Sequence, residues 1–344
     1  MRVAVVGAGY MGSAISVVAR DRGHDVALVG TWLDDEFVRA AAAGEAHPRL
    51  KLAIPGVRHL IFDERTAALE SADVVVIAST SDGVLPVLGR VGHGIARAGV
   101  IGCVSKGFVE DSAHWMTRIS EVLRERFPTL SDRWVAMGGP AKAMEVARGV
   151  PTAFVFGAAK RDVADRLAVA LQGGHVHIET TNDLAGVEAS MALKNAYATA
   201  GGLWDGLAAT GRVEGGAAHN AKAWMFAQAI REIASVVVAL GGRAETVYGF
   251  AGVGDLHVTA AAGRNRAYGD AVGRGGDPAT VGVEMSARGE LTEGYPAIRT
   301  AWRLVNERGL AASTPLLVAL HAIIYERAPV EATLRNLANR LASI

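Results

Sequence analysis

The first half of the chain alternates short apolar runs, rich in β-branched residues, with stretches of helical periodicity. Short apolar runs bounded by turn residues are typical of buried strands, and apolar positions three or four apart indicate helices. We predict strands at 3–6, 26–29, 74–77, 100–104, 135–137, 152–156 and 175–179. We predict the helices between them at 11–22, 35–43, 83–90, 112–126 and 160–171. This alternation predicts a mostly parallel sheet with helices on both faces.

The pattern changes near residue 180, where the strand-like runs cease. From Asp183 onward we predict helices at 184–208, 217–240, 266–272, 296–308 and 315–325. The stretch 184–208 is rich in Ala and Leu with little charge, which is typical of a buried helix, and Asn182-Asp183 is suited to cap its start. The Gly-Arg-Gly-Gly-Asp-Pro stretch at 273–278 indicates a loop. The second half is therefore expected to be all-helical.

Composition narrows the class of protein. The 344 residues include 35 basic and 35 acidic ones, and no basic cluster dominates, so we expect no nucleic-acid partner. No apolar run is long enough to span a membrane, and no signal-peptide pattern precedes the first strand. The single cysteine, Cys103, excludes an internal disulfide, and its apolar neighbours suggest an inert, buried thiol. These features together predict a cytoplasmic protein.

A glycine turn follows the first strand. The sequence Gly-Ala-Gly-Tyr-Met-Gly at 7–12 is G-x-G-x-x-G, placed between an apolar strand and a helical run. In such a turn Gly7 permits the tight bend, Gly9 lets the backbone approach a pyrophosphate, and Gly12 allows close helix–strand packing. The helix start then offers amide donors to the diphosphate. We therefore predict an α/β fold with a Rossmann-type dinucleotide-binding domain at 1–182 and an all-α substrate domain at 183–344.

The choice between NAD and NADP rests on residues after the second strand. An acid about 20 residues after the glycines marks NAD, because it binds the ribose 2′-hydroxyl. Asp34 and Asp35 lie near that spacing, but they could equally cap the next helix. No arginine stands at the strand end to take a 2′-phosphate, although Thr31 and a helix start could do so. Both cofactors stay open, and the acids favour NAD.

Four further stretches carry residues that could bind a substrate or transfer a proton. Lys106, in Ser105-Lys106-Gly107, follows a strand, at the sheet edge where α/β proteins bind ligands, although a solvated loop lysine is the alternative. The glycine-rich turn at 138–145 belongs to the same edge, unless it is a plain connection. We assign no metal ligands.

Lys194 is unusual because it lies within the apolar helix 184–208. Burial lowers a lysine's pKa, which would make Lys194 a usable acid–base group, unless its side chain reaches solvent at the helix edge. The fourth stretch is a glycine-dense loop at 249–256, followed by Gly263-Arg264-Asn265-Arg266. Asp255 in this loop could pair with Lys194. Arg264 has a guanidinium suited to phosphate, and Asn265 at a helix start adds amide donors. A solvated loop with incidental charges is the alternative.

Taken together, the motifs resemble those of soluble NAD(P)-dependent glycerol-3-phosphate dehydrogenases over nearly the whole chain. The matching stretches are Gly7–Gly12, His47-Pro48-Arg49, Ser105-Lys106-Gly107, Gly139-Pro140 with Glu145, Gly186-Val187-Glu188, Leu193-Lys194-Asn195, Ala251–Leu256, Arg264-Asn265-Arg266 with Gly269, and Glu293-Gly294. The resemblance implies a Rossmann domain plus a helical domain, a small phosphorylated substrate and a homodimer.

The resemblance also implies roles for individual residues. Lys194 takes the proton of the substrate hydroxyl, and Asp255 orients the reacting end. Substrate contacts are implied for Lys106, Gly139, Arg264 and Asn265. Cofactor contacts are implied for Gly7, Gly9, Tyr10, Met11, Gly12, Thr31, Lys106, Ala143, Arg264 and Glu293.

Several positions depart from the common family pattern. Met11 stands where Trp is common, Ala141 where Ser or Thr is common, and Gly263 where Ser is frequent. Residues 30–47 resemble an archaeal-type branch. Glycerol 3-phosphate and dihydroxyacetone phosphate are the default substrate pair. The two missing hydroxyls open space that would suit a longer polyol phosphate or phosphosugar. A dinucleotide-sensing protein without catalysis and an unphosphorylated β-hydroxyacid dehydrogenase are less favoured alternatives.

Overall fold

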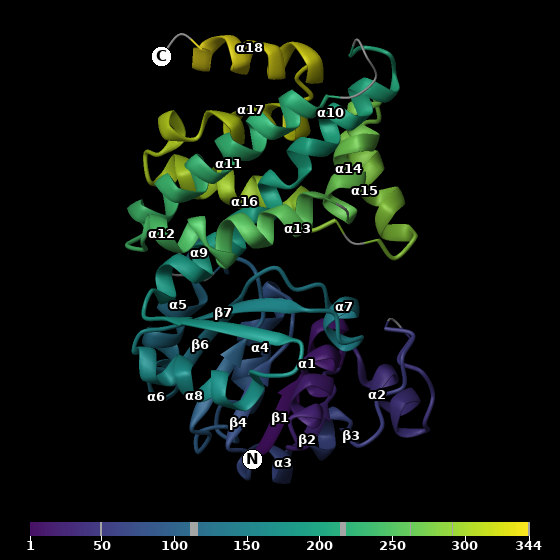
Figure 1. Cartoon of the computed structure of the whole chain (residues 1–344), viewed down its shortest axis with the longest axis vertical. Helices are drawn as coiled ribbons and strands as arrows, with labels where there is room; N and C mark the ends of the chain where they lie inside the picture. The colour runs from purple at the N-terminus through teal and green to yellow at the C-terminus, as the bar shows by residue number, and fades with distance from the viewer. Residues whose placement is uncertain (49, 111–115, 214–217, 262, 291, 343–344) are drawn as a thin grey trace. The chain divides into compact units, whose positions relative to one another are not determined.

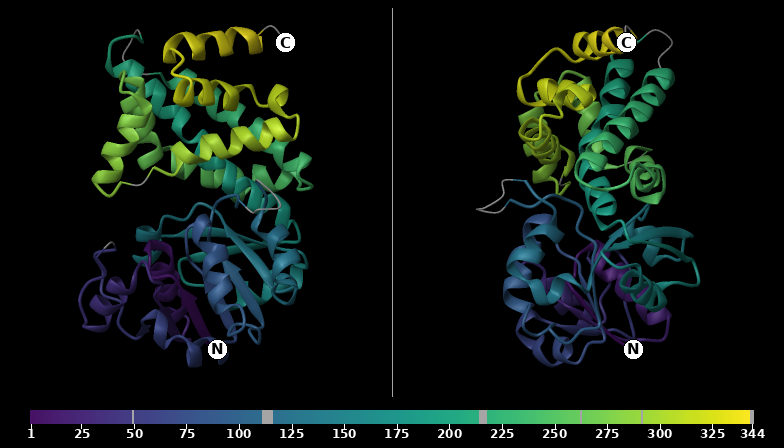
Figure 2. Two further views of the ribbon diagram at one scale, coloured as in Figure 1. Left: turned by 180° about the vertical axis from the view of Figure 1, so that it is seen from behind. Right: turned by 90° about the vertical axis from the view of Figure 1, so that its left-hand side faces the viewer.

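The computed structural model describes residues 1–48, 50–110, 116–213, 218–261, 263–290 and 292–342 (Figures 1 and 2). The chain divides into two compact units, Met1–Glu188 and Ala189–Ile344. Helix α9 (Leu184–Tyr197) crosses the border between them.

The first unit contains an eight-stranded sheet in the order β3-β2-β1-β4-β5-β6-β7-β8. The strands are β1 (Arg2–Val6), β2 (Asp25–Val29), β3 (Arg58–Leu60), β4 (Val74–Ile77), β5 (Val100–Cys103), β6 (Trp134–Gly138), β7 (Thr152–Ala158) and β8 (Val176–Thr181). All seven predicted strands are present, and neighbours pair in parallel except β6 and β7, which are antiparallel. Strand β3 was missed because its three residues, Arg-His-Leu, are half-exposed at the sheet edge and carry no apolar pattern.

Helices cover both faces of this sheet, as predicted (Figure 2). They are α1 (Tyr10–Asp21), α2 (Asp35–Ala42), α3 (Thr66–Glu70), α4 (Ser81–Val91), α5 (Ile119–Arg126), α6 (Pro128–Ser131), α7 (Ala143–Ala147) and α8 (Arg161–Leu171), with a 3₁₀ turn at Phe62–Glu64. The prediction of a helix over 112–126 is wrong at 116–118, where Thr117 instead bridges Val109; residues 112–115 lie outside the described residues. Because both faces are covered, strands such as β4 are buried at every position.

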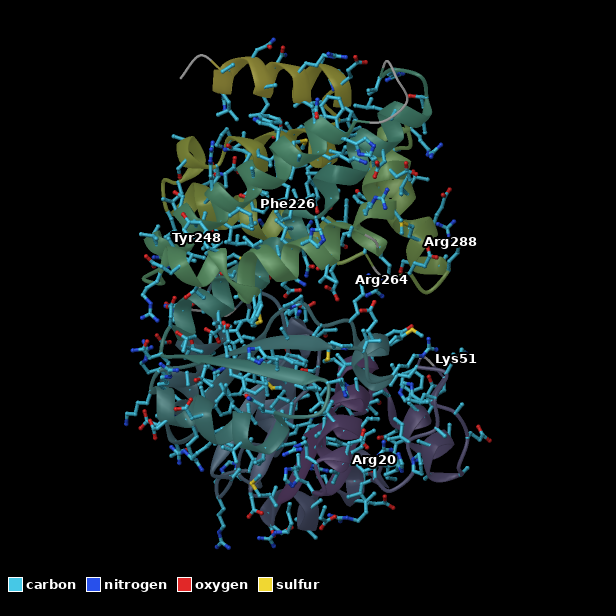
Figure 3. The ribbon with its side chains drawn as sticks, in the orientation of Figure 1. Arg20, Lys51, Phe226, Tyr248, Arg264 and Arg288 are labelled. Atoms are coloured by element: carbon cyan, nitrogen blue, oxygen red, sulfur yellow. The ribbon has the colours of Figure 1, made fainter. Side chains whose placement is uncertain are left out.

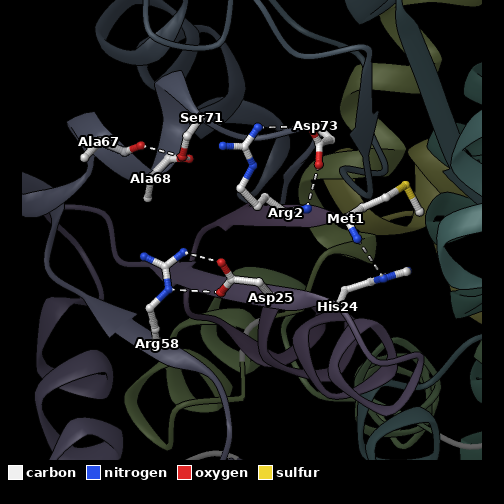
Figure 4. A network of polar contacts seen from close by, with 9 residues as sticks. All are labelled: Met1, Arg2, His24, Asp25, Arg58, Ala67, Ala68, Ser71 and Asp73. Carbon is white, nitrogen blue, oxygen red and sulfur yellow. Dashed lines mark hydrogen bonds and ion pairs between the residues drawn. The ribbon is translucent and has the colours of Figure 1, made fainter.

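Charged pairs mark the amino-terminal edge of the sheet (Figure 4). Arg2 at the start of β1 pairs with Asp73 before β4, and Arg58 in β3 pairs with Asp25 in β2. Both pairs are about half exposed, so each contributes little to stability. The glycine turn follows the opposite, carboxyl end of β1, which leaves that edge for ligands.

The second unit is helical throughout its described residues, as predicted. After α9 come α10 (Thr199–Ala209), α11 (His219–Ala239), α12 (Ala244–Tyr248), a π-helical turn at Phe250–Gly254, α13 (Asp255–Ala261), α14 (Arg264–Gly273), α15 (Pro278–Ala287), α16 (Gly294–Glu307), a 3₁₀ turn at Ala311–Ser313, α17 (Pro315–Tyr325) and α18 (Val330–Ala342). None of the helices in the described ranges has both the length and the apolar character that crossing a bilayer requires.

Two details of the predicted helices are wrong. The helix expected over 184–208 is interrupted at Ala198, so α9 and α10 are two separate helices. The loop expected over 249–256 is a π-helical turn that leads into α13 at Asp255. Gly252 serves close packing in this turn, because a Cβ there would lie 2.1 Å from the carbonyl oxygen of Val247. Helices α12, α13, α15 and α18 were not predicted.

Four glycines bring α10 and α14 into direct backbone contact. A Cβ on Gly202 would lie 2.1 Å from the carbonyl oxygen of Arg266, and one on Gly206 would lie 2.2 Å from that of Asp270. In return, a Cβ on Gly269 would lie 2.2 Å from Thr199 O, and one on Gly273 would lie 2.3 Å from Leu203 O. Only glycine fits at such distances. The contact fixes the position of α14, whose first residues are Arg264 and Asn265.

Candidate active site

The glycine turn has the geometry that a diphosphate cradle requires. Gly7 has a φ of +112°, and a Cβ there would lie 2.5 Å from Ala78 O. A Cβ on Gly12 would lie 2.0 Å from Gly7 O, so this glycine packs α1 against the turn. A Cβ on Gly9 would meet nothing within 4 Å, which leaves open space at the start of α1. The first turn of α1 carries no acidic residue, so the site suits an anion.

Ala8, between the first two glycines, is held at both ends of its backbone. Its N–H donates to Asp34 Oδ2 at 2.7 Å, and its carbonyl oxygen lies 2.8 Å from Nε2 of the buried His47. The N–H of Leu50 donates to His47 Nδ1 at 3.1 Å, so Nε2 carries the proton and donates to Ala8. His47 belongs to the His47-Pro48-Arg49 motif, and this contact gives it a structural role at the glycine turn. Arg49 of the same motif lies outside the described residues.

In the structure, Asp34 and Asp35 bind other parts of the protein, whereas the sequence suggested that they bind the ribose or cap the next helix. Asp34 stands at the N-cap position of α2, but its side chain accepts no bond from the helix. Its Oδ1 instead accepts from the N–H of Thr31 at 2.5 Å and from Thr31 Oγ1 at 2.8 Å. Asp35 Oδ1 accepts from the N–H of Phe62 at 3.0 Å. Asp34 therefore ties the end of β2 to the glycine turn.

Lys106 and Gly139 lie together at the carboxyl edge of the sheet, as the sequence predicts. The half-buried Lys106 donates from Nζ to Gly139 O at 3.4 Å. Gly139 has a φ of +116°, and a Cβ there would lie 2.7 Å from Ala153 O, so only glycine fits. Ala143 begins α7 after this turn, and Tyr10 and Met11 begin α1. Cys103, at the end of β5, is buried, and burial raises the pKa of its thiol to about 12, as expected for an inert cysteine.

Lys194 is the centre of a buried polar group in the helical unit. It is 5% exposed, so its side chain does not reach solvent at the helix edge. Its Nζ donates to the Asp255 carboxylate, which is 1% exposed, and to Thr259 Oγ1 at 2.9 Å. The Thr259 hydroxyl donates in turn to the carbonyl oxygen of Asp255 at 2.6 Å. The predicted pairing of Lys194 with Asp255 is confirmed. Thr259 was missed, although it lies one helical turn after Asp255.

Asn195, the next residue on α9, joins two other segments, the start of α14 and the residues at the start of α16. Its Nδ2 donates to Glu293 Oε2 at 2.9 Å, and its Oδ1 accepts from Asn265 Nδ2 at 3.2 Å. Asn265 Oδ1 accepts from the N–H of Gly294 at 2.9 Å. A Cβ on Gly294 would lie 2.6 Å from Thr199 Oγ1, so this glycine is required for the contact. The network brings together Asn265 and Glu293, which the sequence places far apart.

Arg264 begins α14 and is exposed on the helical unit (Figure 3). Arg266 differs from it, because its Nε donates to Asp205 Oδ2 at 2.7 Å, and Lys222 binds the other oxygen at 2.7 Å. The carboxylate of Asp205 thus fixes α14 to α10 and α11 through two cations. Arg264 is exposed, whereas the guanidinium of Arg266 is engaged within the helical unit.

Two buried glutamates brace α9 at either end. Glu188 accepts from the N–H of Ser120 at 3.1 Å and from its hydroxyl at 2.5 Å, and burial raises the pKa of this carboxyl to about 7. Glu232 on α11 accepts from the Tyr197 hydroxyl at 3.0 Å and from the N–H groups of Leu316 and Leu317. Burial raises its pKa as well. Both were missed as site-supporting groups.

Comparison with known proteins decides the family. Residues 2–164 match the NAD-dependent glycerol-3-phosphate dehydrogenase N-terminus, and residues 183–335 match the corresponding C-terminus. The chain belongs to this dehydrogenase family. The NADP(+)-dependent glycerol-3-phosphate dehydrogenase of Archaeoglobus fulgidus is 35% identical over 98% of this chain and 99% of that protein. The glycerol-3-phosphate dehydrogenase [NAD(P)+] of Agrobacterium fabrum is 31% identical over 98% of this chain and 97% of that protein.

A solved structure supports the same family. The glycerol-3-phosphate dehydrogenase of Coxiella burnetii superposes with a TM-score of 0.80 at 25% identity, covering 98% of both chains. The resemblance inferred from the motifs, including the archaeal-type branch, is confirmed by these relatives. The predicted fold class is confirmed as well.

Proposed function

We propose that this protein catalyses the reversible oxidation of sn-glycerol 3-phosphate to dihydroxyacetone phosphate, with NAD or NADP as the hydride carrier. The observation that carries the proposal is the buried Lys194–Asp255 pair in a member of this dehydrogenase family. A lysine held in an apolar helix next to a carboxylate is suited to proton transfer rather than to solubility. When bound, the nicotinamide accepts or returns the hydride.

The residues of the helical unit handle the substrate. Lys194 Nζ takes the proton of the substrate hydroxyl, while Asp255 and Thr259 hold Nζ in place. Arg264 binds the substrate phosphate through its guanidinium. The Asn265 side chain is committed to Asn195 and Gly294, so we expect it to contribute its main-chain N–H at the start of α14.

The residues of the sheet unit handle the dinucleotide. Gly7, Gly9 and Gly12 receive the pyrophosphate, and Tyr10, Met11, Thr31 and Ala143 add contacts around it. Lys106 contacts substrate and cofactor, with Gly139 beside it. In the helical unit, Glu293 and Arg264 also act toward the cofactor. We further propose that 1–182 and 183–344 are the two functional domains and that the protein is a cytoplasmic homodimer. Light scattering on the purified protein would measure its oligomeric state.

A longer polyol phosphate or phosphosugar is the second candidate substrate. Ala141 and Gly263 favour it, because neither supplies the hydroxyl that is common at these positions in the family. Their small size leaves room for additional carbons. An unphosphorylated hydroxyacid is disfavoured, since it would leave Arg264 without a purpose.

A substrate panel tests the proposal. Purified protein is assayed for oxidation of NADH and NADPH with dihydroxyacetone phosphate and with longer phosphorylated ketoses. We expect turnover with the three-carbon phosphate and loss of at least about 100-fold in kcat for Lys194→Ala. Turnover restricted to longer substrates would favour the second candidate. Absence of turnover with every phosphorylated substrate would contradict the dehydrogenase proposal, and unchanged activity in Lys194→Ala would refute the role of that lysine.

A further inference from the structure

An aromatic cluster with two guanidinium groups lies beyond the carboxyl end of β2. Trp32 is 39% exposed, and the Phe62 ring packs against it edge-on, with centroids 5.5 Å apart. The guanidinium carbon of Arg90, from α4, lies 4.0 Å from the centre of the Trp32 ring. That of Arg65 lies 3.9 Å from the centre of the Phe62 ring. The fold therefore gathers two cations from different elements on one pair of rings.

Arg90 is the cation of this pair that is available to a ligand. Arg65 is tied to its own turn, because its Nη1 donates to Phe62 O at 2.6 Å. Arg90 is exposed, and no ion pair in the described part of the chain engages it. Stacking on an indole orients a guanidinium plane without using its N–H donors. Arg90 is thus pre-oriented, with its donors left for an anion.

Short contacts connect this cluster to the glycine turn. Trp32 directly follows Thr31, whose N–H and hydroxyl bind Asp34 Oδ1. Asp34 Oδ2 in turn binds the N–H of Ala8, inside the turn. The cluster therefore begins one residue from the group that joins the end of β2 to the pyrophosphate cradle. In a dinucleotide fold the adenosine ribose lies at this strand end.

Asp34 itself is poorly placed to select NAD. A carboxylate has about four acceptor positions, and Asp34 already uses three of them on Ala8 and Thr31. The acid that favoured NAD in the sequence is thus committed to the protein backbone. The arginine that was absent from the strand end in the sequence is instead supplied by α4.

We propose that Arg90, held over the Trp32 ring, binds the adenosine 2′-phosphate and that this enzyme consequently prefers NADP(H) to NAD(H). Phosphate suits a guanidinium because the fork of N–H donors matches its oxygens. Arg65 adds positive charge to the same surface. The proposal rests on the proposed function in one respect, namely that the cofactor is a nicotinamide dinucleotide.

Fragment binding tests the proposal without any oxidisable substrate. Dissociation constants of 2′,5′-ADP and 5′-AMP are measured by calorimetry for the wild type, Arg90→Ala, Arg90→Lys and the control Arg97→Ala, which removes an exposed arginine beyond the end of α4. A charged hydrogen bond of this kind is worth about a tenfold change in affinity or more. We expect Arg90→Ala to weaken the binding of 2′,5′-ADP by that factor and to leave the binding of 5′-AMP unchanged. Arg90→Lys should be intermediate, and Arg97→Ala should match the wild type.

Kinetics supply the second readout, as the ratio of kcat/KM for NADPH to that for NADH. We expect the ratio to fall in Arg90→Ala and to hold in Arg97→Ala, with unchanged thermal unfolding in both. The proposal is overturned if Arg90→Ala loses affinity equally for 2′,5′-ADP and 5′-AMP, or loses affinity for neither. Because the fragments bind without turnover, a failed reductase assay with intact selectivity for 2′,5′-ADP would count against the proposed reaction and not against the role of Arg90.

Discussion

Lys194 and Asp255 pair inside the helical unit, with both side chains almost completely buried. Removing one partner of such a pair leaves an uncompensated buried charge. We expect Asp255→Asn, which keeps the shape, to lower kcat by at least about 100-fold, because Nζ loses its orienting partner. Steady-state kinetics with dihydroxyacetone phosphate measure the effect. Asp270→Asn on α14 is the matched control, since its carboxylate pairs with a surface arginine. Equal rates in both variants would contradict the role of Asp255.

The phosphate contact can be isolated by comparing two substrates. Arg264→Ala should raise the KM for dihydroxyacetone phosphate by about tenfold or more, because a charge-assisted contact is lost. Its effect on unphosphorylated dihydroxyacetone should be small. Arg288→Ala, which removes an exposed arginine after α15, serves as the control (Figure 3). A similar loss on both substrates would show that Arg264 does not read the phosphate.

The Ala8 backbone contact predicts that His47 supports cofactor binding from beneath the turn. His47→Ala removes the shorter of two hydrogen bonds to the Ala8 carbonyl oxygen and leaves only that from Ser13 Oγ at 3.3 Å, which costs on the order of 1 kcal/mol. We expect weaker binding of both NADH and NADPH by a common factor, measured by fluorescence titration, together with a lower unfolding midpoint. His93→Ala, an exposed histidine on the same unit, should change neither. A selective effect on one cofactor would be inconsistent with a role in holding the turn.

Much of the fold follows from the sequence because its apolar patterns are unambiguous. Strands such as β4 consist of β-branched residues at every position, and α17 begins and ends where predicted. The polar edge strand β3 and the antiparallel pairing of β7 leave no mark on local composition. The π-helical turn differs from the expected loop because Gly252 serves packing against Val247 rather than flexibility.

Site residues could be predicted from the sequence where a charged residue stands in an apolar or glycine-rich stretch. Lys194 is a charged residue in an apolar helix, and Asp255 is an acid among glycines, so each required a partner. Asp34 and His47 gave no such signal, because their contacts with Ala8 span 26 and 39 residues and depend on the folded sheet. Arg90 is likewise an ordinary surface arginine until the fold brings it to Trp32.

The glycine contact between α10 and α14 predicts that one added methyl group lowers both stability and substrate binding. Gly269→Ala would place a Cβ 2.2 Å from Thr199 O, so α14 must move away from α10. We expect destabilisation of about 1–3 kcal/mol and a raised KM for the phosphorylated substrate, because Arg264 moves with its helix. Gly282→Ala on α15 is the control, as its nearest neighbour would be 4.0 Å away. Urea unfolding and kinetics on both variants decide the matter, and equal behaviour would refute the packing argument.

Glu188 predicts how stability depends on pH. Burial raises the pKa of its carboxyl from 4.5 to about 7, so the folded protein binds this proton more tightly than the unfolded chain. Stability therefore falls as pH rises from about 4.5 to about 7, by on the order of 3 kcal/mol, and stays lower above that range. Glu188→Gln has no proton to lose, and its amide oxygen can still accept from the N–H of Ser120 while its Nε2 donates to the Ser120 hydroxyl. We expect the difference in urea midpoint between variant and wild type to grow in favour of the variant from pH 5 to pH 8. Taking this difference cancels the pH dependence of the other groups, including Glu232, and a constant difference would refute the assignment to Glu188.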